Sequence, residues 1–350
     1  MKQGPLGGEL TPKDALFHEP FEGEWRFAET NWFSFLVPEI PLRGHIMNLF
    51  RPNLGVVRSQ VFMYTAESSR HILGWEFARE DFHLPYEGDL DDYRIPNGLH
   101  VQMTKPFEHW VIRYDSGLDT HFELEFEALM PAICTLETKI DEAGPGYSVF
   151  HRQDPDAPKA TGHIDQIHNV TGEVVLNGER YSVDFPSAHD HSWSPRREFG
   201  HNVIGNFDHA HFGRDFSVSV QTRNDQPHVG TVTNGYVLDH GEVFALKGGE
   251  ARYTMEGWLT RSIDYEVEDT RGKTYRLHGE VEALVEHASV NAYSTCSVIR
   301  WTEGGREGDV GWGESAWHWD VQKMQGAIRD GDFGWSRDFL PPPPNSNGRR

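Results

Sequence analysis

The 350-residue sequence predicts an all-β protein made of two domains of antiparallel strands, with few helices. Three observations support this fold class: apolar and polar residues alternate along many segments, turn sequences recur at short intervals, and helical periodicity is scarce. The chain is also long for a single hydrophobic core, which favours two domains. Many short strands with frequent turns usually form barrels or sandwiches, so we expect one of these arrangements in each domain.

The expected elements begin with one short helix and continue as strands. Residues 11–17 predict the helix, because Thr11 can cap its first turn. Further along the chain, apolar residues alternate with charged or polar ones over residues 121–129, 216–220 and 275–286. Such a period of two is typical of antiparallel strands that turn one face to a core and the other to water.

Turn and linker sequences divide the chain. Asn177-Gly178 separates two strand-like runs and supplies the positive φ angles that a two-residue hairpin turn needs. The stretch 141–161, rich in Gly, Pro and Asp, is the best candidate for an inter-domain linker. Residues 125–129 resemble residues 280–284, which agrees with two similar halves. We therefore expect an N-terminal β domain at 1–155, a C-terminal β domain at 162–335 and a Pro-rich flexible tail at 341–350.

Composition and charge exclude several classes of partner. The formal net charge of -22 argues against a nucleic-acid surface, which needs clustered Lys and Arg, and against binding to anionic membranes. No apolar run is long enough to span a bilayer, and no glycine-rich phosphate-binding motif occurs. Cys134 and Cys296 lie far apart, which argues against a disulfide scaffold. We expect a cytoplasmic protein without stable membrane insertion. The oligomeric state stays open, with a homodimer as one candidate.

Residues 187–197 are the strongest candidate for a site, because they contain two histidines, an aspartate, a tryptophan and two arginines. A carboxyl group desolvated by aromatic rings has a raised pKa, so Asp190 beside Trp193 is a candidate general acid. His191 would return the proton or orient water. The competing interpretation is structural, with Asp190 paired to Arg196 or Arg197 and Trp193 filling a core.

Other candidates lie on three further segments. In the first segment, polar residues stand at the start of an apolar strand that begins near Glu29. In the second, Asp165 and His168 come just before the Asn-Gly hairpin. In the third, Asp208 precedes a second His-x-His sequence, whose histidines share one face of an extended strand. As catalytic residues we expect Asp190, His191, His168 and Asp208. As substrate-binding residues we expect Glu29, Asn31, Trp32, Trp193, Arg196, His209 and His211.

A metal site is a less favoured alternative. In extended strands His189 and His191 would share one face, as would His209 and His211, and convergence of the four imidazoles could hold an ion. Against this, strand alternation points the neighbouring aspartates away from those faces, where they could not support the ligands. We therefore expect no metal and no cofactor, and these histidines would serve in proton transfer and hydrogen bonding.

Four segments together carry a resemblance to a known group. They are Glu29-Thr-Asn-Trp32, Arg51-Pro-Asn-Leu-Gly55, Val170-Thr-Gly-Glu-Val174 and, as the most specific, Asp190-His-Ser-Trp-Ser-Pro-Arg196. The pattern resembles the AttH-like branch of the calycin superfamily, which includes carotenoid 1,2-hydratases, kievitone hydratase and lipocalin-like Diels–Alderases. Ser194 and His189 depart from it, because relatives more usually have glycine and arginine at these positions.

The resemblance spans residues 20–325 and so covers nearly the whole chain. It implies two lipocalin-like β-barrels or half-barrels packed together, with an apolar ligand pocket. It also implies a site role for Asp190, His191 and Trp193.

Together, the residues and the resemblance predict a cofactor-independent lyase or isomerase that acts by acid–base chemistry. Its partner would be a hydrophobic terpenoid, steroid-like or aromatic small molecule, which it would hydrate, dehydrate or cyclise. The aromatic faces of Trp32 and Trp193 would favour a cationic intermediate. Two alternatives stay open: a non-catalytic carrier of an apolar ligand, and a metal-dependent lyase or hydrolase that uses the histidines as ligands.

Overall fold

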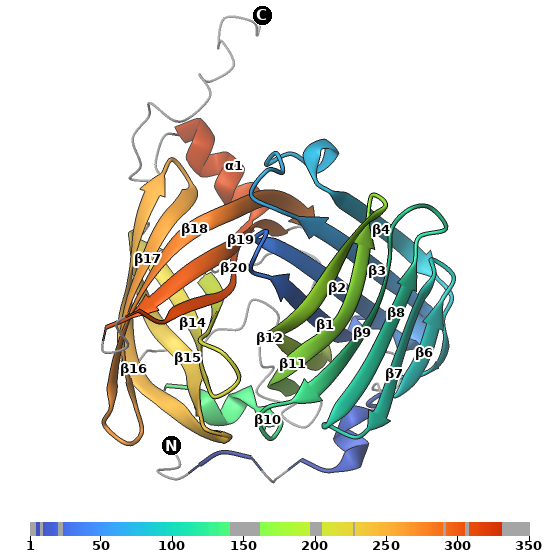
Figure 1. Cartoon of the computed structure of the whole chain (residues 1–350), viewed down its shortest axis with the longest axis horizontal. Coiled ribbons are helices and arrows are strands. Elements are labelled where there is room, and N and C mark those ends of the chain that lie inside the picture. The colour runs from blue at the N-terminus through green and yellow to red at the C-terminus, as the bar shows by residue number, and fades with distance from the viewer. Residues whose placement is uncertain are drawn as a thin grey trace, which may run out of the picture.

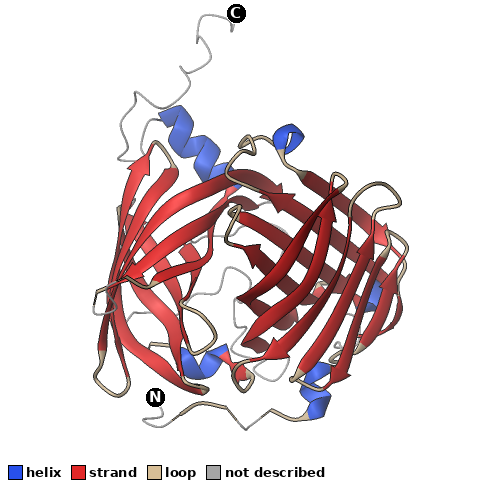
Figure 2. Ribbon diagram, in the orientation of Figure 1, coloured by secondary structure: helices blue, strands red, loops and turns tan. Residues whose placement is uncertain are grey.

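The computed structural model describes residues 5–7, 10–19, 24–140, 162–196, 205–226, 228–289, 292–304 and 308–330. In this part of the chain the strands form two units, an open curled sheet and a closed barrel, which lie side by side (Figure 1). Strands dominate both units, and helices are few and short (Figure 2). The predicted all-β class, with one half-barrel and one barrel, is confirmed.

The open sheet contains the first twelve strands and forms the half-barrel. Their bounds are β1 (Phe27–Val37), β2 (Leu42–Arg51), β3 (Val56–Tyr64), β4 (Phe77–Leu84), β5 (Glu87–Asp89), β6 (Asp92–Ile95), β7 (Leu99–Lys105), β8 (His109–Asp115), β9 (His121–Ala128), β10 (Ile133–Cys134), β11 (Gly162–Leu176) and β12 (Glu179–Pro195). The strand order is β4-β3-β2-β1-β12-β11-β9-β8-β7-β6-β5, and β10 pairs with β11.

The closed barrel contains the other eight strands. They are β13 (Gly205–His211), β14 (Phe216–Gln226), β15 (Val229–Asp239), β16 (Glu242–Glu256), β17 (Leu259–Asp269), β18 (Thr274–Ser289), β19 (Ala292–Glu303) and β20 (Val310–Asp320). Each strand pairs with the next, and β13 also pairs with β20, which closes the barrel. The helices are η1 (Pro12–Ala15), η2 (Pro52–Leu54), η3 (Ile72–Gly74), η4 (Thr135–Thr138) and α1 (Val321–Asp330), of which only α1 is an α-helix.

Period-two patterning explains both hydrophobic cores. In β9 the side chains of Phe122, Leu124 and Phe126 are buried in the half-barrel, while the glutamates between them face water. The barrel interior is filled in the same way by inward-facing residues such as Val218 and Trp301. The expected helix at the N-terminus is a short 3-10 turn, η1, instead of a longer α-helix.

The boundary between the two units differs from the expected one at residues 155–162. The Asn177-Gly178 hairpin forms as predicted, with φ angles of 54° and 82°. Its strands, however, pair with β9 and β1 of the half-barrel, so the change to the barrel comes after Pro195. The expected linker at 141–161 and the expected tail at 341–350 lie outside the described residues.

The half-barrel and the barrel contact each other through the outer face of the half-barrel. Two apolar clusters seal this contact, one around Ile133, Ile167 and Leu238 and the other around Leu36 and Val298. Buried polar residues also meet there: the Ser34 hydroxyl on β1 donates to Glu314 on β20 across 2.9 Å. Polar groups buried between two units need partners, so this zone is the first place to seek a site.

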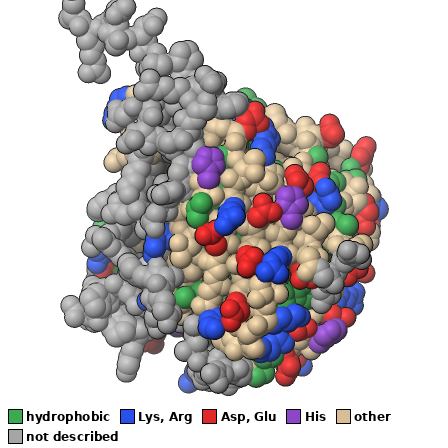
Figure 3. All heavy atoms as spheres, turned by 90° about the vertical axis from the view of Figure 1, so that its left-hand side faces the viewer, with side chains coloured by type: hydrophobic (Ala, Val, Ile, Leu, Met, Phe, Trp, Pro, Cys, Tyr) green, Lys and Arg blue, Asp and Glu red, His purple; other side chains and the backbone are tan. Residues whose placement is uncertain are grey.

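On the barrel face shown in Figure 3, acidic and basic side chains are interspersed. Cross-strand ion pairs such as Arg276–Glu266 and Lys247–Glu268 also occur on the barrel strands. The net charge of -22 is therefore not gathered into one acidic patch on this face. Among the helices that the structure describes, none is long and apolar enough to cross a membrane.

Candidate active site

A row of three side chains crosses the outer face of the half-barrel. Trp32 on β1 lies opposite Asp190 on β12, and Asp190 lies opposite Asp165 on β11. Directly opposite residues in an antiparallel sheet share a face, so the three side chains point the same way, toward the barrel. We call Trp32, Asp190 and Asp165 the sheet row.

A second row crosses the barrel wall that faces the sheet row. Glu314, His209, Ser219 and Tyr236 lie opposite one another on β20, β13, β14 and β15. We call these four residues the barrel row, and all of them are buried. The two rows meet where the rings of Trp32 and His209 stack, with centroids 6.3 Å apart.

Asp165 has the most unusual environment in the two rows. It is only 1% exposed, and neither carboxyl oxygen has a hydrogen-bond partner of good geometry among the described residues. Burial raises the pKa of this carboxyl above its usual range, although the positive charges of His209 and His163 oppose the shift. The hydroxyl of Tyr236 lies beside it and is also buried without a partner of good geometry in the described residues. Asp165 therefore holds a proton more readily than an ordinary carboxyl group.

Asp190 is the least buried member of the sheet row. Its carboxylate lies 3.6 Å from His163 Nε2, and the two side chains are 18% and 9% exposed. Burial lowers the pKa of His163, but Asp190 outweighs that effect and the pKa is raised overall. This pair, which contains the member of the sheet row nearest to solvent, gives the buried row a route for proton exchange.

An ion pair anchors the other end of the barrel row. Arg43 Nε on β2 lies 2.9 Å from Glu314 Oε2, and both side chains are almost fully buried. Burial opposes ionisation of Glu314, but Arg43 and His209 outweigh it and lower its pKa to about 2. Glu314 Oε1 lies 3.3 Å from His209 Nδ1, and this contact raises the pKa of His209 against the effect of burial. Glu314 therefore orients His209 toward Trp32.

Aromatic rings complete this zone. Phe207, two residues before His209 on β13, lies with its ring centroid 6.5 Å from that of Trp32 and 6.4 Å from that of His163. The Trp32 indole donates to His45 Nδ1 across 3.0 Å, which fixes the ring. Aromatic faces beside carboxyl groups stabilise positive charge, so the arrangement suits a cationic intermediate.

The inner face of the same strands carries a different cluster. Glu29 on β1 is fully buried, and its Oε1 lies 2.8 Å from His18 Nδ1 and 2.6 Å from His191 Nε2. Burial opposes ionisation of Glu29, but the bonds from both imidazoles outweigh it and lower its pKa. Trp193 stacks on His18 with ring centroids 3.6 Å apart. We call His18, Glu29 and His191 the inner triad.

The structure separates the predicted pair Asp190–His191. These neighbours point to opposite faces of β12, Asp190 to the barrel and His191 to the inner triad, so the expected proton-transfer pair does not form. Asn31 also lies on the inner face, where its Oδ1 is 2.8 Å from His189 Nε2. The Arg196 guanidinium donates to Thr30 and Ser192, and burial lowers its pKa while Asp190 acts on it electrostatically against that effect. Arg197, the other partner considered for Asp190, lies outside the described residues.

Three other predicted residues lie outside both rows. Asp208 points into the barrel, where Tyr265 donates to it, and burial raises its pKa to about 7. His168 lies in the half-barrel beside Phe126, and burial lowers its pKa to about 3. His211 is next to His209 but contacts Ser217, and its pKa is also lowered to about 3 by burial. The histidines at 189 and 191 do not converge with those at 209 and 211.

Sequence analysis missed several members of the site. It named Asp165 only as a neighbour of His168, and it did not single out His163, Tyr236, Glu314, Arg43 or His18. Glu314 lies in a Trp-rich segment that reads as an ordinary strand, so its sequence gives no hint of burial. For Asp165 one indication existed: a charged residue between Ile164 and Ile167 in a strand buried on both faces.

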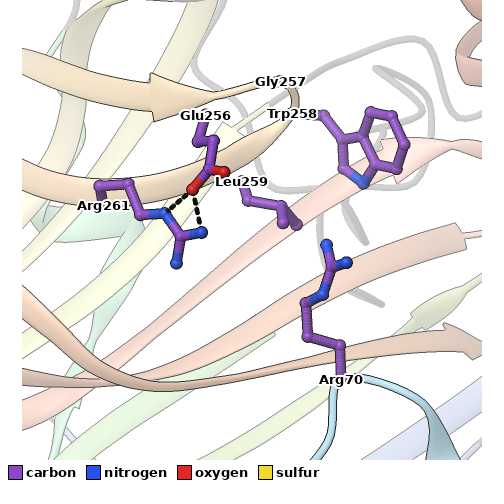
Figure 4. A pocket seen from close by; sticks show the side chains of 6 residues that line it. All are labelled: Arg70, Glu256, Gly257, Trp258, Leu259 and Arg261. Carbon is purple, nitrogen blue, oxygen red and sulfur yellow. Dashed lines mark hydrogen bonds and ion pairs between the residues drawn. The ribbon is translucent and has the colours of Figure 1, made fainter. Parts of the chain in front are cut away.

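A shallow pocket elsewhere offers no comparable chemistry. It has a volume of about 230 Å³ and lies between the β16–β17 turn and the loop after β3, as Figure 4 shows. Its lining residues are Arg70, Glu256, Gly257, Trp258, Leu259 and Arg261. The charged groups already have partners, since Arg261 binds Glu256 and Arg70 lies 3.8 Å from Glu286.

A protein-family model matches most of the chain. A family model described as a domain of unknown function, DUF7064, matches residues 11–320. No curated protein sequence matches the chain.

Three solved structures share the fold of the whole chain. A protein from Nitrosomonas europaea provisionally assigned as AttH has a TM-score of 0.56 at 14% identity, over 89% of this chain and 97% of its own. CghA, solved with Sch210972, has a TM-score of 0.54 at 11% identity, over 90% of this chain and 94% of its own. Kievitone hydratase from Nectria haematococca has a TM-score of 0.50 at 11% identity, over 90% of this chain and 97% of its own. The predicted resemblance to the AttH-like branch is confirmed at the level of the fold.

Proposed function

The chain belongs to the DUF7064 family, and we propose that it is an enzyme that moves protons on a hydrophobic small molecule by acid–base catalysis at the sheet and barrel rows. The reaction would be a hydration, dehydration or cyclisation and would need no redox cofactor. The observation that carries this proposal is the Asp165 carboxyl, which is buried and has no hydrogen-bond partner of good geometry among the described residues. Such groups cost stability and are kept where function needs them.

Each member of the rows has a role in this proposal. Asp165, whose protonated form is favoured by burial, donates its proton to a carbon–carbon double bond or to a leaving hydroxyl. The resulting cation lies against Trp32 and Phe207. In a hydration, water adds to the cation and its proton passes to Asp190, which exchanges it through His163 with solvent. Asp165 regains a proton from solvent by the same route, which restores the acid for the next turnover. His209, oriented by Glu314, binds a polar group of the substrate.

The substrate class follows from what lines the two rows. Aromatic rings and few open charges favour an extended apolar molecule with one or two oxygen atoms, as in terpenoids, steroid-like compounds and aromatic natural products. Two of the similar structures support this direction. One is named as a hydratase and the other was solved with a small molecule, so the fold accommodates both. We extend this use of the fold to the present chain.

The test begins with the ligand. Protein is purified, bound small molecules are extracted and identified by mass spectrometry, and the compound is then incubated with fresh protein in D₂O. We expect a product whose mass differs by one water, or an isomer, with deuterium on carbon. Asp165→Asn should lower turnover about 10²–10⁴-fold, as expected for loss of a general acid.

A matched control uses a carboxylate on β12, the strand next to that of Asp165, but outside the rows. Asp184→Asn changes an exposed residue of β12 that binds Arg214 and Asn169, and it should leave turnover unchanged. If the wild type returns the compound unchanged and free of deuterium after long incubation, the protein is a carrier. If Asp165→Asn keeps full turnover, the assignment of the acid is wrong.

A further inference from the structure

We propose that the inner triad of His18, Glu29 and His191 binds a divalent transition-metal ion of the zinc type. This site lies on the inner face of the half-barrel, whereas the acid–base groups of the proposed function lie on the outer face. The two proposals therefore stand or fall separately. A metal here would link the segment before β1 to the two central strands of the sheet.

Geometry is the first argument. The ligand atoms His18 Nδ1, a Glu29 carboxylate oxygen and His191 Nε2 all lie within 4.8 Å of one another. The two N···O distances are 2.8 Å and 2.6 Å. Ligands that bind zinc tetrahedrally at about 2.0–2.1 Å are roughly 3.3–3.4 Å apart, so each N···O distance would have to open by roughly 0.5–0.8 Å to admit the ion. In the described part of the chain, no other group of three such residues meets this condition.

The chemistry of the donors is the second argument. Two imidazoles and one carboxylate form a set that zinc and other first-row metals use, with one or more positions left for water. The carboxylate of Glu29 supplies the negative charge, and both imidazoles bind a metal in their neutral form.

The surroundings hold the ligands in place and leave an entry route. Glu29 also accepts a bond of 3.0 Å from the backbone N–H of His18, which fixes the carboxylate orientation. Trp193 stacks on the His18 ring. The His18 side chain is 22% exposed while that of Glu29 is fully buried, so an ion can enter from the His18 side. Such outer contacts are typical of metal sites because they orient the ligands.

A second His–carboxylate cluster provides the matched control. His278 lies 2.7 Å from Asp264 through Nδ1 and 2.7 Å from Glu280 through Nε2. Its two carboxylates bind opposite edges of the ring, so the three residues cannot converge on one ion. This cluster also combines imidazole and carboxylate groups and is exposed, and it therefore reports any nonspecific zinc binding by surface residues.

The experiment uses the full chain purified without an affinity tag, stripped with chelator and titrated with Zn²⁺ alone. We expect one ion per chain by elemental analysis after gel filtration. His191→Asn should weaken the affinity by more than about 100-fold, because even the loss of an outer partner of a metal ligand costs about 10–100-fold. His278→Gln should bind zinc like the wild type.

A second measurement keeps the proposal testable if His191→Asn fails to fold. Co²⁺ added to the stripped wild type should give visible absorption bands of a site with nitrogen and oxygen ligands, and equimolar Zn²⁺ should remove them. The proposal is overturned if the folded wild type binds no stoichiometric zinc and shows no such bands. It is equally overturned if folded His191→Asn retains wild-type affinity.

Discussion

The two faces of β1, β11 and β12 carry the same kinds of residue in opposite states. On the inner face, Glu29 is bonded to both His18 and His191, so its negative charge is fully satisfied. On the outer face, Asp165 is equally buried but has no hydrogen-bond partner of good geometry among the described residues. A satisfied buried carboxylate stabilises a structure or holds an ion, whereas an unsatisfied one is maintained at a cost. The contrast therefore points to the outer face for catalysis.

The outer face also contains a buried carboxylate, Glu314, that is paired with Arg43. Removal of Arg43 is the strongest test of the contrast between paired and unpaired buried carboxylates. Arg43 and Glu314 are each 1% exposed and form an ion pair. Arg43→Met leaves the Glu314 carboxylate buried without its main counter-charge. We expect the free energy of unfolding to fall by about 3–5 kcal/mol, measured by urea denaturation.

The double variant Arg43→Met/Glu314→Leu serves as the control for this prediction. It removes both charges and should recover a large part of the lost stability, because a buried pair can often be replaced by apolar residues at little cost. A loss below about 1 kcal/mol in Arg43→Met would contradict the burial of this pair.

The barrel interior provides an intermediate case between the two faces. One oxygen of Asp208 accepts bonds from Tyr265 and Asn206, while the other has no partner in the described residues. Burial raises the pKa of Asp208 from 3.8 to about 7. A carboxyl whose pKa is raised on folding stabilises the fold fully below its unfolded pKa, and this contribution is lost as the pH rises through the folded pKa.

We therefore expect the free energy of unfolding of the wild type to fall by roughly 2–4 kcal/mol, relative to that of Asp208→Asn, as the pH rises from about 4 to about 7. Urea denaturation of both proteins at several pH values gives this difference, and groups that titrate in both proteins cancel. Parallel pH profiles of the two proteins would show that Asp208 is not desolvated as the structure describes.

Much of the fold could be predicted because it depends on local patterns. Alternation in residues 121–129 identifies a strand with one buried face, and Asn177-Gly178 identifies a hairpin. The partners of that hairpin could not be predicted in the same way. Pairing of β11 with β9 and of β12 with β1 depends on contacts between distant segments, so the boundary was placed too early.

The site was predictable only in part for the same reason. Strand alternation correctly places Glu29, Asn31 and His191 on one face and Trp32 and Asp190 on the other. What lies across from each face comes from elsewhere in the chain, from the barrel wall on one side and from the N-terminal segment on the other. No local pattern shows that Glu314 or His18 will arrive there, because their roles are created by packing.

The smallest expected change in stability concerns a His–carboxylate cluster that is exposed, and it tests whether burial or residue type decides what such a cluster contributes. His278 has two carboxylate partners, as close as those in the inner triad, but its side chain is 45% exposed. Its hydrogen bond to Asp264 is the largest cause of its raised pKa, with Glu280 adding to the effect against partial burial. Solvent and salt screen such pairs, so their contribution to stability is small whatever their geometry.

His278→Gln should therefore lower the free energy of unfolding by less than about 0.5 kcal/mol at pH 6. Because the pKa of His278 is raised on folding, its contribution is fully present below the ordinary pKa of histidine and is lost as the pH rises. The variant and the wild type should thus be equally stable at pH 9 by urea denaturation. A loss above about 1 kcal/mol at pH 6 would mean that partner number, rather than burial, decides what such clusters contribute, and the contrast between the two faces would lose its basis.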